Sequence, residues 1–155
     1  MKIGIMLYSR TGNTRQVASR LQEKLVASGH EVTLEELEPR HSAPPSAEIV
    51  ELKTYPPIDA YDALTFAAPV WGGQPAGPLT GYLEHLSSLQ GKKIACLVTG
   101  FFPAKWGGNQ ALEKMTGICR SKGADVAGSG SVTWFSLSRG RQILQVVEHL
   151  SQLFK

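Results

Sequence analysis

Residues 9–14, Ser9-Arg10-Thr11-Gly12-Asn13-Thr14, are the stretch that decides the fold. They lie between an apolar run over residues 2–8 and an amphipathic segment that ends at Gly29. The apolar run predicts a strand buried on both faces. The segment after the turn has apolar residues at spacings of three and four, which predicts a helix that ends at the glycine. A strand, a hydroxyl-rich turn and a helix in this order predict a phosphate-binding loop.

The chemistry of this turn suits an anion. The first backbone N–H groups of a helix have no partners within the helix, and the helix dipole places about half a positive charge there. Ser9, Thr11 and Thr14 can add hydroxyl donors. Gly12 allows a close approach of the backbone or a positive φ, and Asn13 tolerates a left-handed turn. The alternative is a plain loop in which Thr11 or Asn13 only caps the helix.

The same hexamer resembles the phosphate loop of flavodoxins and flavodoxin-like flavoproteins, whose pattern is Ser or Thr, any residue, then Thr-Gly-Asn-Thr. In that family the loop binds the 5′-phosphate of FMN through hydroxyls and backbone N–H groups. The resemblance therefore implies FMN as the cofactor, held by Ser9, Arg10, Thr11, Gly12, Asn13 and Thr14. A Walker A loop requires Gly-Lys-Ser/Thr, which this turn lacks.

Length and composition predict one domain over residues 1–155. The chain is 42% hydrophobic, and a chain of this size buries about 70% of its unfolded surface. No apolar segment is long enough for a signal peptide or a membrane span. We therefore expect a cytoplasmic protein without membrane contact, as a monomer or a homodimer.

Several classes of site are not expected. Cys96 and Cys119 lie in a predicted strand and helix without Cys-x-x-Cys spacing, so both are interpreted as reduced core thiols. The four histidines are scattered without ligand spacing, which predicts no metal site. A Gly-x-Ser-x-Gly elbow is missing, which argues against a serine hydrolase. We assign no catalytic acid or base.

Charge is unevenly distributed along the chain. The net charge is +3, with 7 basic and 9 acidic residues over residues 1–62, and 9 basic and 4 acidic residues over 63–155. The basic residues form no long run and are not interleaved with aromatic residues. Nucleic-acid binding is therefore not expected.

The rest of the chain repeats the pattern of strand and helix. Further strands are predicted over residues 31–37, 63–68, 92–99 and 124–134. Helical spacing marks the intervening segments through Leu79, Leu83, Leu86, Leu112, Met115, Cys119, Ile143, Val147, Leu150 and Phe154. Gly91 and Gly123 are expected to mark helix ends, and Ser138 to cap the last helix. This alternation implies an α/β fold with a parallel sheet and right-handed crossovers.

The flavodoxin-like resemblance implies a doubly wound five-stranded sheet of order 2-1-3-4-5, with helices on both faces. Ligands would bind at the carboxyl edge of the sheet, between the loops 9–14, 69–77 and 99–108. Residues 39–60 hold five of the nine prolines. That segment is interpreted either as a short helix over 46–53, with Ile49 and Leu52 facing inward, or as an irregular crossover.

The second loop, residues 69–78, is too rich in glycine and proline to be part of a regular element. It resembles the Pro-Val-aromatic-Gly segment of many flavodoxin-like oxidoreductases. The resemblance implies that Trp71 lies against or beside the isoalloxazine ring, and that Pro69, Val70, Gly72 and Gly73 line the site. Gly72 is the candidate for a peptide flip at the redox edge. Alternatively, Trp71 is a partly buried aromatic that packs under a loop.

The third loop, residues 99–108, carries three aromatic residues. The resemblance implies that the backbone N–H groups of Thr99, Gly100 and Phe101 hold the pyrimidine end of the flavin, with Gly107 in the same site. Which aromatic ring stacks on the flavin stays open, as does a loop that folds back over the core. Trp134 and Phe135, at the end of the fifth strand, either extend this aromatic wall or fill core, and core is the favoured expectation.

The resemblance covers nearly the whole chain and implies an FMN-binding flavodoxin-like electron-transfer protein or a small flavin oxidoreductase. The chain departs from the family pattern in its charge, because single-electron flavodoxins are usually strongly acidic around the flavin. Here the loops offer Arg10, Lys105, Arg139 and Arg141. Positive charge stabilises a reduced anionic ring and attracts NAD(P)H or an acidic redox partner, which favours an NAD(P)H-linked reductase as a competitor to a shuttle. A third hypothesis is a flavodoxin-like protein-binding module without flavin.

Overall fold

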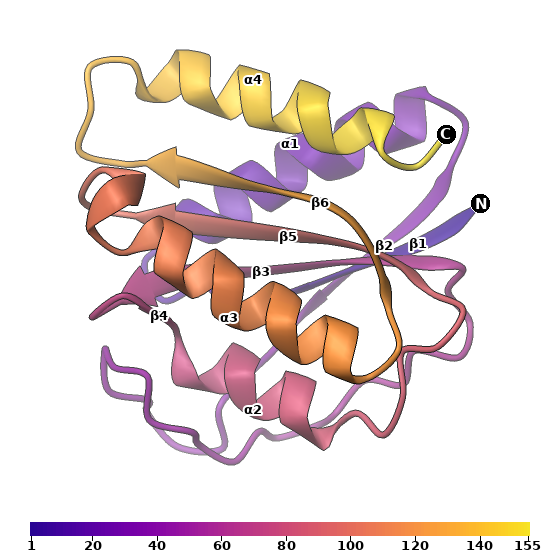
Figure 1. Ribbon diagram of the computed structural model, residues 1–155, viewed down its shortest axis with the longest axis horizontal. Helices are drawn as coiled ribbons and strands as arrows, with labels where there is room; N and C mark the ends of the chain where they lie inside the picture. Colours follow the sequence, from indigo (N-terminus) through magenta and orange to yellow (C-terminus); the bar gives the residue numbers. More distant parts are fainter.

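The structure is a computed structural model that describes residues 1–155. Five parallel strands form a sheet of order β2-β1-β3-β5-β6 with helices on both faces (Figure 1). The strands are β1 (Lys2–Leu7), β2 (Glu31–Glu36), β3 (Ala63–Trp71), β5 (Lys93–Gly100) and β6 (Asp125–Thr133). The helices are α1 (Asn13–Ala27), α2 (Gly77–His85), α3 (Gly108–Ser121) and α4 (Arg139–Gln152). The predicted strand order is confirmed, because β5 and β6 are the fourth and fifth strands expected from the sequence.

The sheet has a separate hydrophobic core on each face. Ile3, Ile5 and Leu7 of β1 pack with α1 and α4, whereas Met6 of the same strand packs with α2 and α3. Successive residues of a strand point to opposite faces. This explains why β1 reads as a nearly continuous apolar run. None of the helices combines the length and the apolar character needed to cross a membrane.

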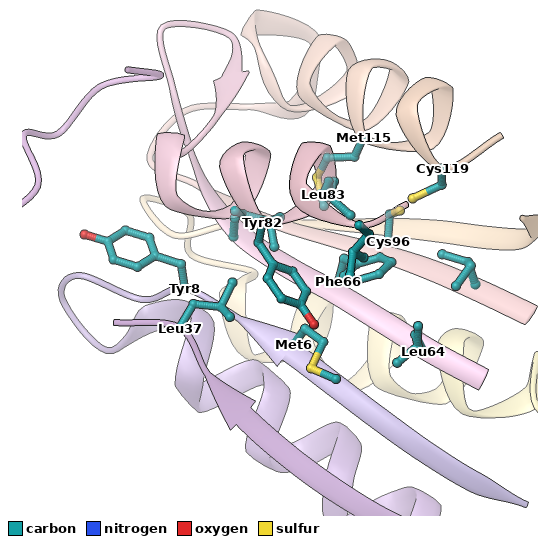
Figure 2. Close-up of a cluster of buried hydrophobic side chains, with 14 of the residues drawn as sticks. Met6, Tyr8, Leu37, Leu64, Phe66, Tyr82, Leu83, Cys96, Met115 and Cys119 are labelled. Atoms are coloured by element: carbon teal, nitrogen blue, oxygen red, sulfur yellow. The ribbon is translucent and has the colours of Figure 1, made fainter. Parts of the chain in front are cut away.

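The two cysteines belong to the core under α2 and α3. Figure 2 shows Cys96 of β5 and Cys119 of α3 pointing toward one another. Both thiols are free and buried, as expected. The hydrogen bond with the Cys119 thiol and burial raise the pKa of Cys96. In the same cluster the Tyr82 hydroxyl donates to the Pro56 carbonyl at 2.5 Å, and burial raises the pKa of Tyr82.

The proline-rich crossover contains no helix, so the short helix expected over residues 46–53 is wrong and the irregular alternative is confirmed. Only an isolated antiparallel bridge joins Pro39 to Leu52. Leu52 is buried as expected, but Ile49 is 51% exposed. Proline lacks a backbone N–H and disfavours helix at the preceding residue. The backbone therefore bonds elsewhere, and the Ser46 carbonyl accepts the N–H of Gly77 at 3.1 Å.

Of three expected element boundaries, one is confirmed and two differ in detail. Gly123 follows α3 in a positive-φ conformation, as a helix-ending glycine should. Gly91 does not end a helix, because α2 stops at His85 and the glycine turns the chain before β5. Ser138 stands at the start of α4 but its hydroxyl makes no capping hydrogen bond. That hydroxyl instead accepts from the Gln142 side chain at 3.0 Å.

Gly77 holds the crossover against the start of α2. A Cβ atom at this position would lie 1.6 Å from the backbone oxygen of Glu48, so the backbone would have to move. We expect Gly77→Ala to lower the free energy of unfolding by about 3 kcal/mol, measured by urea denaturation. The matched control is Gly117→Ala within α3, where a Cβ meets nothing within 4 Å and should stabilise by about 0.5–1 kcal/mol. Equal stabilities of the two variants would contradict this account of the crossover.

Candidate functional site

The three predicted loops meet at the carboxyl edge of the sheet around a cavity of about 160 Å³. The residues that line it are Ser9, Arg10, Thr11, Asn13, Thr14, Pro69, Val70, Trp71, Thr99, Gly100, Phe101 and Trp134. All except Trp134 were expected in the site. The expected residues outside the lining are all glycines: Gly12, Gly72, Gly73 and Gly107. The structure therefore separates residues that face the cavity from residues that shape its loops.

The turn after β1 presents free backbone donors. Gly12, with φ +95°, occupies the N-cap position of α1, so the interpretation of Thr11 or Asn13 as the helix cap is wrong. The Ser9 hydroxyl instead accepts the N–H groups of Gly12 at 3.1 Å and Arg15 at 3.3 Å. The N–H groups of Thr11, Asn13 and Thr14 have no acceptor within the protein. Three unpaired donors at a helix N-terminus match the requirements of a phosphate.

A buried hydrogen bond ties this turn to the third loop. The hydroxyls of Thr14 in α1 and Thr99 at the end of β5 lie 2.7 Å apart, across 85 residues of sequence. Both side chains are buried. Each hydroxyl has one proton to donate, so Thr14 can donate to a phosphate only when Thr99 is the donor in this pair.

The second loop is more regular than the sequence indicated. β3 continues to Trp71, and a two-residue turn leads into the short antiparallel strand β4 (Gln74–Pro75). Gly72 and Gly73 have φ of +60° and +74°, as a type I′ hairpin turn requires. The expectation of an irregular segment is wrong here because Pro69 pairs with Thr99 in the parallel ladder. Gly72 and Gly73, interpreted from the sequence as signs of an irregular loop, belong only to the two-residue hairpin turn.

The second and third loops pack against each other through glycines. A Cβ atom on Gly107 would lie 3.2 Å from Cα of Gly73. A Cβ atom on Gly73 would lie 2.8 Å from Oε1 of Gln110. The third loop contains the short 3₁₀ helix η1 (Ala104–Trp106), after which Gly107 leads into α3. Small residues at this contact therefore fix the distance between the two loops.

A cluster of exposed aromatic rings lies beside the cavity, which Phe101 lines. Phe101, Phe102, Trp106 and Phe135 are 57–74% exposed, so the third loop does not fold back over the core. The rings of Phe101 and Phe135 stack with centroids 5.2 Å apart and planes 8° apart. The expectation that Phe135 fills core is wrong, because β6 ends at Thr133 and the chain then turns at the sheet edge.

Trp134 lines the cavity and was assigned to the core from sequence. It is partly buried and also packs against the core under α1 and α4. Its backbone N–H donates to the Gly100 carbonyl at 2.6 Å. The sequence could have placed Trp134 in the site, because it directly follows the fifth strand and the carboxyl ends of parallel strands meet at one edge of the sheet.

The rim of the site is positively charged. The guanidinium of Arg10 lies 6.0 Å from the centroid of Trp71, and that of Arg139 lies 4.9 Å from the centroid of Trp134. Lys105 lies 5.9 Å from the Trp106 ring. The loops 9–14, 69–77 and 99–108 and the turn 134–139 contain no aspartate or glutamate. These cations therefore have no carboxylate partner within the loops of the site.

The model of the family described as NADPH-dependent FMN reductase matches residues 1–137, which include all three loops. The chain belongs to this family. Flavodoxin 2 from Bacillus cereus is 23% identical, with 99% of this chain and 97% of that chain covered and a TM-score of 0.69. A flavoprotein in complex with FMN from Lactobacillus acidophilus NCFM is 17% identical, with 94% and 97% covered and a TM-score of 0.67. At these identities the likeness shows the fold.

The site of this member of the FMN reductase family fits FMN on its own geometry. The unpaired N–H groups of Thr11, Asn13 and Thr14 suit the phosphate. The cavity of about 160 Å³ is smaller than the roughly 300–1,000 Å³ of a pocket that encloses a whole ligand. It suits the phosphate and ribityl end, while the partly exposed rings of Trp71 and Phe101 are available to the isoalloxazine.

We expect Thr99→Val to lower the free energy of unfolding by about 1–2 kcal/mol, because it leaves the buried Thr14 hydroxyl without its partner. Thr14→Val should lower the free energy of unfolding by a similar amount. The double variant should cost less than the sum of the two, with a coupling of at least about 0.5 kcal/mol. Urea denaturation of the parent, the two single variants and the double variant measures this double-mutant cycle. Strict additivity would show that the two hydroxyls do not stabilise each other.

Proposed function

We propose that this member of the FMN reductase family is an NAD(P)H-linked, FMN-dependent oxidoreductase. The observation that carries the proposal is the basic rim of the FMN site, with Arg10, Lys105 and Arg139 on aromatic rings and no carboxylate in the loops. Positive charge there attracts an anionic dinucleotide and stabilises a reduced anionic ring. A cytoplasmic location is part of the proposal, since two buried free thiols suit a reducing compartment.

The residues of the chain bind and orient, and the cofactor supplies the redox chemistry. FMN would supply the hydride-accepting chemistry, in which NAD(P)H gives up two electrons and one proton and becomes NAD(P)⁺. Thr11, Asn13 and Thr14 would hold the phosphate through their backbone N–H groups. Trp71 and Phe101 would flank the ring. The peptide between Gly72 and Gly73 would face the redox edge, where two glycines at positive φ let it rotate without a Cβ clash.

An electron shuttle is the second candidate function. The exposed rings of Phe101, Phe102, Trp106 and Phe135 give the rim an apolar surface that suits a protein partner. A binding module without flavin would use the same surface. The unpaired donors of the turn after β1 favour the flavin-binding readings over this third one, because a module without flavin leaves those donors unused.

We expect the protein without cofactor to bind FMN at a ratio of one to one, with quenching of flavin fluorescence. Thr11→Ala should weaken binding by about tenfold, because a hydroxyl donor to a charged phosphate is lost. Thr54→Ala, which removes an exposed threonine of the crossover, is the matched control and should bind as the parent does. No quenching with the parent protein would refute the flavoprotein proposal and revive the binding module.

We expect NADPH to reduce the bound FMN without any other protein, followed by the loss of visible flavin absorbance under anaerobic conditions. The rate should fall as ionic strength rises, because salt screens the basic rim. FMN in solution without protein is the control. A bound flavin that NADPH leaves oxidised would overturn the reductase assignment and favour the shuttle.

A further inference from the structure

A second and larger hollow lies directly beside the cofactor cavity. It measures about 490 Å³ and shares Ser9 and Arg10 with that cavity. Its walls come from the carboxyl ends of β1 and β2 and from the irregular crossover. Its lining also includes Glu36, Glu38, Arg40, Ala43 and Lys53. The family assignment and the FMN site do not use this hollow.

The hollow is lined by three cations, Arg10, Arg40 and Lys53, and by two carboxylates, Glu36 and Glu38, so its net charge favours an anion. Its two carboxylates already have partners: Glu36 lies 2.5 Å from Arg15 and Glu38 lies 3.2 Å from Lys53. Arg40 pairs with Glu51 at 3.4 Å. These pairs are solvent-exposed and therefore weak, so an incoming phosphate can compete for the cations.

Arg10 stands between the two cavities. Its guanidinium lies over Trp71 on the cofactor side and donates to the Ala43 carbonyl at 3.4 Å on the side of the hollow. It forms no ion pair in the structure. Arg10 can therefore contact the phosphates of a ligand that extends from one cavity into the other.

We propose that the hollow binds the 2′-phosphoadenosine end of NADPH, with Arg10 at the pyrophosphate and with Arg40 and Lys53 at the 2′-phosphate. This inference rests on the proposed reductase function. The hollow is open to solvent, and its volume of about 490 Å³ lies within the roughly 300–1,000 Å³ of small-molecule sites. The nicotinamide end of the same dinucleotide would then extend past Arg10 toward Trp71.

The position of the hollow in the fold supports the adenosine assignment. In dinucleotide-binding α/β sheets, an acidic residue near the end of the second strand binds the ribose, and a nearby arginine accommodates a 2′-phosphate. The pyrophosphate binds there at the first βα turn, which in this chain is assigned to FMN, so only the position at the end of the second strand is shared. β2 ends at Glu36, and Glu38 and Arg40 follow within four residues. The similarity to those folds concerns only the position of the hollow in the sheet. The proposal itself depends on the cations of this chain.

The test is isothermal titration calorimetry of the FMN-loaded protein with adenosine 2′,5′-bisphosphate, adenosine 5′-monophosphate and inorganic phosphate at low ionic strength. We expect the bisphosphate to bind most tightly. The double variant Arg40→Ser/Lys53→Ser should weaken bisphosphate binding by about tenfold or more, since two charge-assisted contacts are lost. Binding of the monophosphate should change much less, and the NADPH/NADH ratio of kcat/KM should fall by a similar factor.

The matched control is Arg20→Ser/Lys114→Ser, which removes the same charge from exposed positions on α1 and α3. It should keep the parent affinity and the parent NADPH/NADH ratio. An unchanged ratio and affinity in the first double variant would overturn the proposal, as would inorganic phosphate binding as tightly as the bisphosphate. If the protein takes up no FMN, the reductase function fails. The nucleotide titrations on the flavin-free protein then still decide whether the hollow binds a 2′-phosphate.

Discussion

The hydrogen bond between Thr14 and Thr99 joins parts of the site that the chain keeps 85 residues apart. It forms because β1 and β5 both flank β3, so the first turn of α1 and the end of β5 reach the same edge of the sheet. Pro69 pairs with Thr99 in the ladder and places the second loop between them. Gly73 and Gly107 then bring that loop into contact with the third. A site with unpaired phosphate donors on one side and aromatic rings on the other follows from this arrangement.

Charge distinguishes this site from that of an acidic electron shuttle. The cations at the rim lie on aromatic rings at 4.9–6.0 Å, and the loops that carry them have no carboxylate. An arginine over an aromatic face keeps its charge while its donors stay open to a ligand. The same rings that flank a flavin can therefore hold the cations that attract an anionic reductant.

The irregular crossover between β2 and β3 contributes to the chemistry of this edge. Its prolines prevent a helix, and its backbone bonds to the start of α2 through Ser46 and Gly77. The Tyr82 hydroxyl holds its far end at Pro56. Because the crossover forms no helix, Arg40 and Lys53 lie on the wall of a hollow that opens next to the turn after β1. A regular helix over the same residues would have bonded to itself and placed these side chains according to its own periodicity.

The sequence alone determined the succession of strands and helices along the chain and the positions of the three loops at the sheet edge, because these depend on local signals. An apolar run, a glycine at a turn and a helical spacing are each encoded within a few residues. The order of the strands within the sheet was implied by the resemblance to flavodoxin-like proteins. The tertiary structure decided which residues meet: the Thr14 hydroxyl with Thr99, the ring of Phe101 with Phe135, and Trp134 with the cavity. It also decided between the helix and the irregular crossover that the sequence left open over residues 46–53, in favour of the crossover, and it replaced the irregular second loop by a hairpin. Such contacts join residues distant in sequence, and their geometry exists only once the sheet has brought its strands together.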